Sequence, residues 1–138
     1  MDYYKLSEEP LQAAVSNKEQ ALYRMSVSMS TLAIDLLLKS VMYRIDPTHD
    51  LIMGHNHAGI VTFIENIYPK QDNVRRAAKL SRKYFKDSRY SRSENFAVFT
   101  EELADDFIVY ANLIKEYVDK DCQATLEDLQ KRFGKPHS

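Results

Sequence analysis

The segment that most limits the fold is residues 17–45, where apolar side chains recur with the period of an α helix. One stripe advances by alternating steps of three and four residues, and it consists of Leu22, Met25, Met29, Leu32 and Leu36, with Tyr43 in phase. From residue 32 a second stripe joins it, made of Ile34, Leu37, Leu38 and Val41. A helix that is apolar almost all round has to be covered on several sides. We therefore expect it at the centre of a bundle, covered by other helices or by a second copy of the chain.

Helix signals continue through the rest of the 138 residues. Only three glycines are present, too few for the tight turns of a β-rich protein, and the four prolines are spaced to sit at helix boundaries. Ser7 and Asp72 are predicted N-caps, and Thr100 opens an acidic first turn. Helices are expected at residues 7–15, 17–45, 56–67, 72–85, 100–120 and 124–133. The predicted fold is all-α, an up-and-down bundle of four to five main helices in a single domain, residues 1–138, with its core at about 18–120.

Two of these helices are predicted to be strongly two-faced. The inner face of helix 72–85 is expected at Val74, Ala77, Leu80 and Tyr84, and its outer face at Arg75, Arg76, Lys79, Arg82, Lys83 and Lys86. The inner face of helix 100–120 is expected at Leu103, Phe107, Tyr110, Ile114 and Tyr117. Its outer face is acidic and comprises Glu101, Glu102, Asp105, Asp106 and Glu116.

Charge is strongly segregated along a chain whose net charge is only −1. Residues 70–92, which begin at Lys70 and end at Arg92, hold nine bases and two acids, whereas residues 93–138 hold ten acids and five bases. One interpretation is a surface that contacts the phosphates of a nucleotide or of RNA, because Lys and Arg drive sequence-independent affinity for nucleic acid. The other is a solvated helix face that complements the acidic helix of the same chain or of a partner.

Cysteine content and the N-terminus bound the class of protein. Cys122 is the single cysteine, which excludes an internal disulfide and a multi-cysteine metal site. The first residues lack the apolar region of a signal peptide, and the longest apolar stretch, residues 32–42, is too short to span a bilayer. The expectation is a cytoplasmic protein with no membrane association.

Three short segments, taken together, resemble HEPN domains, the "higher eukaryotes and prokaryotes nucleotide-binding" helical bundles. They are Ala33-Ile34-Asp35 followed by Lys39, then Gly54-His55-Asn56, and then Ser88-Arg89-Tyr90 in a predicted link. The resemblance covers about residues 18–120. It implies a four- to five-helix bundle, commonly a homodimer, and a partner nucleotidyltransferase of the kind found in toxin–antitoxin systems.

The catalytic branch of that family carries an Arg-x4–6-His motif on a late helix, and this sequence departs from it. No histidine lies between His57 and His137. The one pair at that spacing is Arg44 and His49, which comes early and is interrupted by Pro47. If it were catalytic, the arginine would stabilise the charge at phosphorus and the histidine would act as general base, giving a metal-independent ribonuclease.

Asp35 and Lys39 are four residues apart and so share one helix face. They form either an ion pair that makes a buried polar spot tolerable, or a site where Lys39 offers its ammonium group to a phosphate. His49, His55 and His57 lack the helical spacing of a metal site, so we predict no metal and no cofactor.

The leading hypothesis is a non-enzymatic HEPN-like module that binds a nucleotide or nucleic-acid phosphate through Lys39, His55, Asn56, Arg89 and Tyr90. The first alternative is the ribonuclease that uses Arg44 and His49. The second is a structural dimer whose charged faces bind protein.

Overall fold

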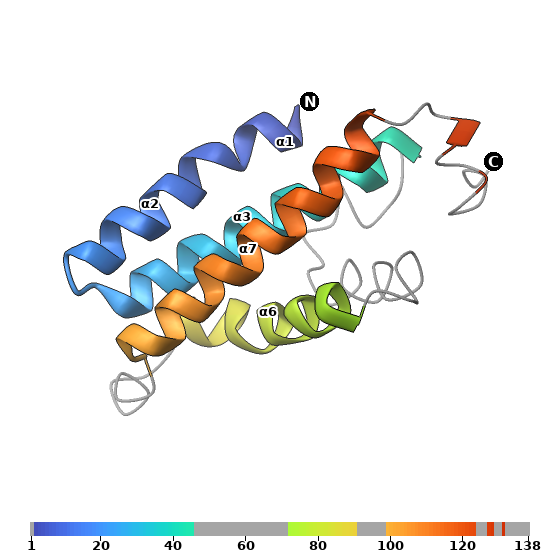
Figure 1. The fold of residues 1–138 in the computed structure, drawn as a ribbon. Helices are drawn as coiled ribbons and strands as arrows, with labels where there is room; N and C mark the ends of the chain where they lie inside the picture. The colour runs from blue at the N-terminus through green and yellow to red at the C-terminus, as the bar shows by residue number, and fades with distance from the viewer. Residues whose placement is uncertain (1, 46–71, 91–98, 124–126, 129–130, 132–138) are drawn as a thin grey trace.

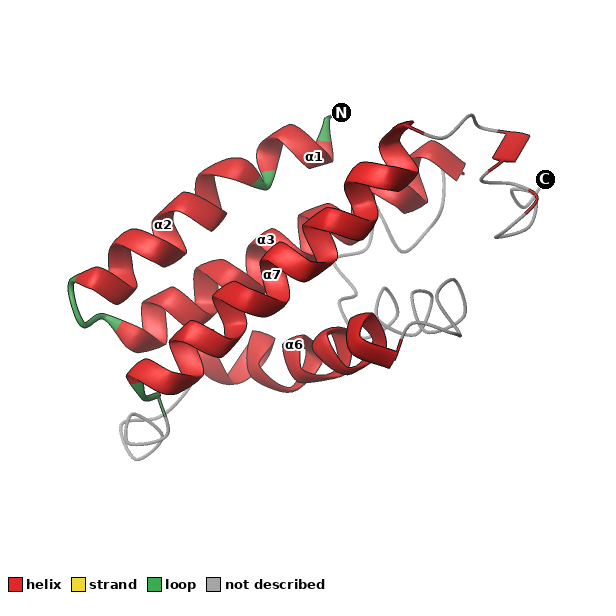
Figure 2. Ribbon diagram, viewed as in Figure 1, coloured by secondary structure: helices red, strands yellow, loops and turns green. Residues whose placement is uncertain are grey.

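The computed structural model describes residues 2–45, 72–90, 99–123, 127–128 and 131. Its helices are α1 (Tyr3–Leu6), α2 (Glu8–Glu19), α3 (Tyr23–Ile45), α6 (Asp72–Tyr90) and α7 (Glu101–Gln123). Helices account for nearly all of the described chain, and no strand occurs in it (Figure 2). The predicted all-α class is confirmed. The helix expected at 56–67 lies outside the described residues, as does most of the one expected at 124–133.

Helix α3 is the central element of the described bundle. It packs against α7 along its length, with α1 and α2 along one side and α6 along the other (Figure 1). Helix α7 also contacts α2 and α6. The bundle therefore has two outer layers around the α3–α7 pair, and the predicted central position of the long apolar helix is confirmed.

The core lies on the second apolar stripe of α3 and not on the first. Ile34, Leu37, Leu38 and Val41 are fully buried, and Val27 extends this face toward the start of the helix. Leu22 and Met25 of the first stripe are 42% and 53% exposed, so the described bundle does not cover the start of this helix on that side. The buried orientation also places Ser26, Ser30 and Ala33 inside, and such small residues let α2 approach closely.

Helix α7 is likewise rotated from the predicted phase. Phe107 and Ile114 are buried as expected, but the rest of the buried face is formed by Ala104, Ala111 and Val118. Leu103, Tyr110 and Tyr117 are only partly buried against the core. The small alanines allow close contact between α7 and α3, and the rings flank it: Phe107 meets Tyr84 of α6 edge to face at 5.3 Å and Tyr110 at 5.8 Å.

Several predicted helix boundaries are confirmed and others were wrong. Asp72 begins α6, and the Thr100 side chain accepts a hydrogen bond from the Leu103 amide at 3.1 Å, as an N-cap does. Ser7 occupies the predicted N-cap position of α2, but its side chain makes no cap bond; its hydroxyl donates instead to the Tyr4 carbonyl because the helical turn α1 precedes it. Helix α6 ends at Tyr90, so Ser88, Arg89 and Tyr90 belong to a helix and not to a link.

The predicted helix 17–45 is broken near its start, at a turn between α2 and α3. The Leu22 amide donates to the Asn17 carbonyl and the Ala21 amide to the Lys18 carbonyl, which together form a Schellman motif. Ala21 takes the left-handed position of this motif, with φ of 60°, a position that glycine usually occupies. No glycine or proline marks the break in the sequence, and for that reason the helical periodicity ran straight through it.

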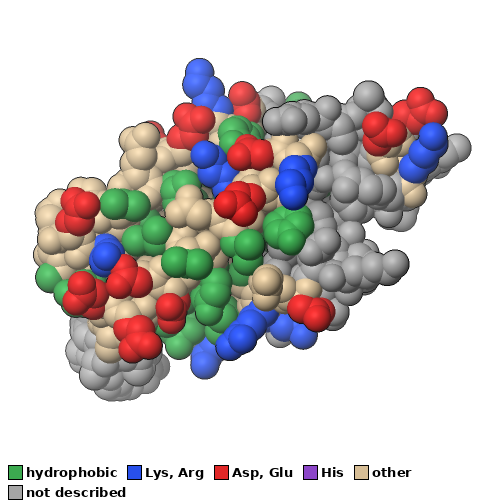
Figure 3. All heavy atoms as spheres, in the orientation of Figure 1, with side chains coloured by type: hydrophobic (Ala, Val, Ile, Leu, Met, Phe, Trp, Pro, Cys, Tyr) green, Lys and Arg blue, Asp and Glu red, His purple; other side chains and the backbone are tan. Residues whose placement is uncertain are grey.

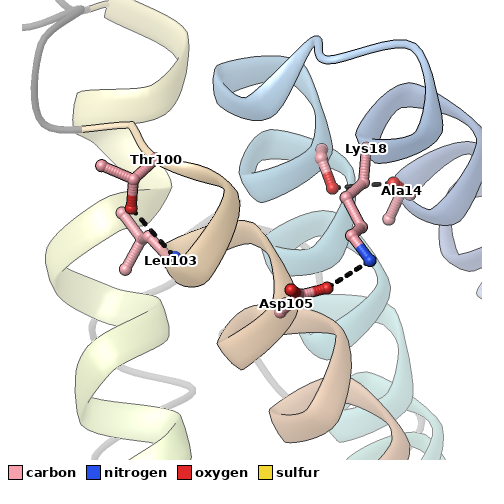
Figure 4. A network of polar contacts seen from close by, with 6 residues as sticks. Ala14, Lys18, Thr100, Leu103 and Asp105 are labelled. Atoms are coloured by element: carbon pink, nitrogen blue, oxygen red, sulfur yellow. Dashed lines mark hydrogen bonds and ion pairs between the residues drawn. The ribbon is translucent and has the colours of Figure 1, made fainter.

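Polar contacts fasten α2 to the central pair. The Ser26 hydroxyl on α3 donates to the Ala14 carbonyl on α2 at 2.7 Å, and the Lys18 ammonium lies 2.5 Å from the Asp105 carboxylate on α7 (Figure 4). The hydrogen bond to Asp105, helped by the charges of Asp105, Glu101 and Glu19, raises the pKa of Lys18 despite some desolvation. Tyr4 of α1 adds a hydrogen bond to Asp119 near the other end of α7.

By length and composition, the segment Tyr23–Arg44 is apolar enough to cross a membrane. However, 72% of the qualifying window is buried inside the bundle, and Asp35 and Lys39 lie in the middle of the helix. These features are those of the core helix of a folded domain.

Replacing Ala21 with glycine should stabilise the monomeric fold. The left-handed conformation costs a residue with a β-carbon about 1–2 kcal/mol, and the greater freedom of glycine in the unfolded chain offsets part of the gain. We expect Ala21→Gly to raise the free energy of unfolding by about 1 kcal/mol, measured by chemical denaturation at low protein concentration. The matched control Ala13→Gly, inside α2, should lower it by about 1 kcal/mol. Equal losses in both variants would contradict the assigned turn.

The Lys18–Asp105 contact should contribute stability that disappears at high pH. A group whose pKa is raised on folding stabilises the fold fully below its unfolded pKa, near 10.5, and loses this contribution as the pH rises through the folded value. Thermal unfolding of Lys18→Met should thus show a deficit relative to wild type at pH 8 that shrinks above about pH 10.5. The control Lys79→Met, an exposed lysine of α6, should show no such change in the difference. A deficit that stays constant with pH would rule out the ion pair as its cause.

Candidate functional site

The buried pair Asp35 and Lys39 is the most unusual chemical feature of α3. Nζ of Lys39 lies 2.9 Å from Oδ2 of Asp35, and their side chains are only 8% and 6% exposed. The predicted pairing on one helix face is confirmed. Asp35 follows Ser26 by nine residues, which is two and a half helical turns, so the pair lies on the flank of α3 opposite the one bonded to α2.

Among the described residues, the ammonium group of Lys39 is placed against one carboxylate. An ammonium group carries three N–H donors. Among the described residues, Asp35 is the one acceptor in contact with Nζ of Lys39. A buried ammonium group that is paired with one carboxylate can also donate to an anionic or carbonyl ligand.

Helix α6 presents the largest cationic surface in the described part of the chain. Its buried side consists of Ala77, Ser81 and Ser88, with Leu80 and Tyr84 packed partly against the core. Arg76, Lys79 and Lys83 are exposed and follow one another at helical spacing on the outward face. The 19 residues of α6 extend over about 28 Å. Figure 3 shows Lys and Arg side chains gathered over α6, away from the acidic cluster at the start of α7.

This cationic face is not neutralised by the described acidic side chains of α7. Arg76, Lys79 and Lys83 make no ion pair with them, and Asp105 pairs with Lys18 of α2 instead. Glu101, Glu102, Asp106 and Glu116 are exposed. The two charged faces thus remain open to solvent at these positions. Lys83 lies 5.3 Å from the ring centre of Tyr84, and that ring packs edge to face against Phe99 and Phe107.

The structure describes the predicted ligand-binding residues only in part. His55 and Asn56, together with His49 of the alternative catalytic pair, lie outside the described residues. Arg89 and Tyr90 are the last two residues of α6, and their side chains are not among those described. Arg44 is half-buried in the last turn of α3; it follows Lys39 by five residues and so does not share its face.

Sequence reasoning missed the two serines that orient α6. Ser81 and Ser88 are 0% and 3% exposed, and the Ser88 hydroxyl donates to the Phe85 carbonyl at 3.4 Å. Residues 77, 81, 84 and 88 recur at steps of four and three, which was the available signal. A serine is tolerated in the core when its hydroxyl donates a hydrogen bond to a carbonyl of its own helix. With these serines facing the core, the cationic positions of α6 face outward.

Two surface depressions formed by described residues lie away from these cations. One of about 570 Å³ is lined by Asp2, Lys5, Leu6, Glu8, Glu9 and Gln12, a set with more acids than bases and therefore poorly suited to phosphate. The other, of about 330 Å³, surrounds the α2–α3 turn and is lined by residues 21–25 and Phe99.

The Asp35–Lys39 pair should be strongly coupled in stability. Removing one partner leaves a buried charge uncompensated, so Lys39→Met and Asp35→Leu are each expected to cost about 3–5 kcal/mol in urea denaturation. The double variant removes both charges and should lie within about 2 kcal/mol of wild type. If the two single effects simply add in the double variant, the buried ion pair is refuted.

Comparison with known proteins identifies the fold described above. A protein-family model, described as the HEPN domain, matches residues 1–121. This span includes all the helices named above except the last two residues of α7. No curated protein and no solved structure gives a significant match. The match covers most of the chain and agrees with the resemblance carried by the segments around Asp35, His55 and Arg89. The protein belongs to the HEPN domain family.

Proposed function

We propose that this protein is a non-enzymatic HEPN module that binds the phosphate groups of a nucleotide or of RNA through the outer face of α6. The observation that carries the proposal is the exposed series Arg76, Lys79 and Lys83, which the acidic helix α7 does not neutralise. These three side chains lie within residues 76–83, about 10 Å along the helix axis, and a row of cations suits the repeated charges of a polynucleotide better than a single small anion.

Lys39, His55, Asn56, Arg89 and Tyr90 complete the proposed contacts. Lys39 contributes a charge held in place by Asp35, and Arg89 with Tyr90 extends the cationic helix to its C-terminal end. The proposal includes a homodimer and a nucleotidyltransferase partner, both of which rest on membership of the family.

Salt dependence of RNA affinity is the sharpest test of this surface. The slope of log K against log[salt] for single-stranded nucleic acid is about −0.7 for each phosphate contacted. Replacing Arg76, Lys79 and Lys83 together with glutamine should therefore make the slope less steep by about 2 and weaken binding of a labelled 12-nucleotide RNA. The measurement is fluorescence anisotropy between about 50 and 200 mM salt.

A matched variant controls for net charge. Glutamine at Lys5, Lys120 and Lys131 removes the same number of positive charges from exposed sites on α1, α7 and the C-terminal segment. It should leave the slope almost unchanged. Equal losses in the two triple variants would show nonspecific attraction and refute the proposed α6 surface.

The same RNA distinguishes the enzymatic alternative. A binding module leaves the oligonucleotide intact, whereas a metal-independent ribonuclease shortens it in the presence of EDTA. Cleavage that is lost in both Arg44→Ala and His49→Ala would replace the binding proposal with the catalytic one.

A further inference from the structure

An apolar seam continues across the turn that separates α2 from α3. Its positions advance by strictly alternating steps of four and three residues, interrupted by one charged side chain, Lys18. The seam consists of Leu11, Val15, Lys18, Leu22, Met25, Met29, Leu32 and Leu36. This is the spacing with which two long helices pack against each other side by side.

The closed bundle leaves this seam incompletely covered. None of its members is among the fully buried side chains. Val15, Leu22 and Met25 are 39%, 42% and 53% exposed, and they form the majority of the large exposed hydrophobic side chains in the described part of the chain. All three lie within six residues of Ala21, so the uncovered apolar surface is concentrated at the turn.

The turn itself interrupts a sequence suited to continuous helix. Residues 16–25 contain no glycine or proline, and most of them, including Lys18, Glu19, Gln20 and Leu22, are good helix formers. Ala21 is the one described non-glycine residue with positive φ. It is also the residue type that most favours a helix, and the closed fold holds it in a conformation that disfavours a β-carbon.

We propose that two copies of this chain exchange their α1–α2 arms. In the exchanged dimer the turn at residues 20–22 straightens, α2 and α3 become one helix over residues 8–45, and each arm packs on α3 and α7 of the partner. This inference concerns how two copies join, and it does not depend on what the α6 face binds.

The contacts that hold the arm are compatible with exchange. Ser26 bonds to Ala14 across the closed turn, and these two residues are equally far from residue 20. An antiparallel pair of straight helices with its two-fold axis near residue 20 therefore reproduces that bond between copies. The Lys18–Asp105 and Tyr4–Asp119 contacts transfer in the same way, since each joins the arm to α7.

The same geometry buries the seam. On a continuous helix, Ala14 and Ser26 are twelve residues apart and so differ by about 120° around the axis. The seam positions lie between them, on the face that the two copies share. Exchange thus buries Val15, Leu22 and Met25 further, while the arm keeps its existing contacts. It also returns Ala21 from the left-handed to the helical conformation.

Light scattering with size-exclusion chromatography, over a range of protein concentrations, tests the proposal through two substitutions. Ala21→Gly favours the turn and disfavours the straight helix at both hinges of a dimer, and should raise its dissociation constant by about a hundredfold or more. Met25→Glu places a charge in the seam at a side chain that the monomer exposes, and should also yield monomer. The matched control Val109→Glu, at an α7 side chain 62% exposed and outside the seam, should leave the dimer intact.

Cross-linking separates exchange from side-by-side association. The chain carries Lys18→Cys and Asp105→Cys together with Cys122→Ser, so that the two new thiols are the only ones. A short bis-maleimide joins these thiols, and the products are separated on a denaturing gel. An exchanged dimer yields covalent dimers, and addition of Ala21→Gly shifts the product to the single-chain mass. Any of three results would overturn the proposal. The wild-type protein is monomeric at all concentrations, the dimer is unaffected by Ala21→Gly and Met25→Glu, or a dimeric sample yields only single-chain products.

Discussion

The fold depends on covering α3 on three sides at once. Helices α2, α6 and α7 each bury part of its circumference, and nearly every residue from Ser26 to Met42 is buried as a result. The side that accepts α2 has to be built from small residues, and Ser26, Ser30 and Ala33 supply them. The densest apolar side takes α7, whose own contact face is kept thin by Ala104 and Ala111.

Burial of a whole helix forces its polar side chains to find local partners. The Ser40 hydroxyl donates to the Leu37 carbonyl, and the Thr31 hydroxyl donates to the Ser28 carbonyl, so both are satisfied within the helix. Asp35 satisfies Lys39 in the same way. Ser30 differs: its buried hydroxyl has no hydrogen-bond partner among the described residues, at a cost of about 1–3 kcal/mol. Because Ser30 lies one turn after Ser26, this weak point falls on the flank that receives α2.

The sequence predicted the elements of this bundle better than their orientation. The α-class, the central position of α3, the Asp72 and Thr100 starts and the Asp35–Lys39 pair all follow from local periodicity and spacing. The rotation of α3 and α7 about their own axes does not follow from periodicity. Each helix carries two apolar stripes, and packing against the neighbouring helices decides which stripe is buried. Of the candidate site, Lys39 was located correctly within a buried pair, whereas the roles of His55, Asn56, Arg89 and Tyr90 remain predictions. The break at Ala21 was not predicted, since residues 16–25 contain no glycine or proline and most of them are good helix formers.

The exposure of the first stripe of α3 has a physical origin that bears on how two copies of the chain can join. The first stripe of α3 and the end of α2 belong to one seam that the closed fold divides, so periodicity was correctly detected but does not describe the monomer. A sequence that retains an undivided seam beside a turn without glycine is locally in conflict with its closed fold. Such conflicts are expected where a chain has a second arrangement to satisfy. Helix α6 shows no comparable conflict: its small and serine-containing inner face and its cationic outer face agree on a single orientation. The cationic surface is therefore fixed by packing in one chain, whereas the arm α1–α2 is the part whose contacts a second copy can equally supply.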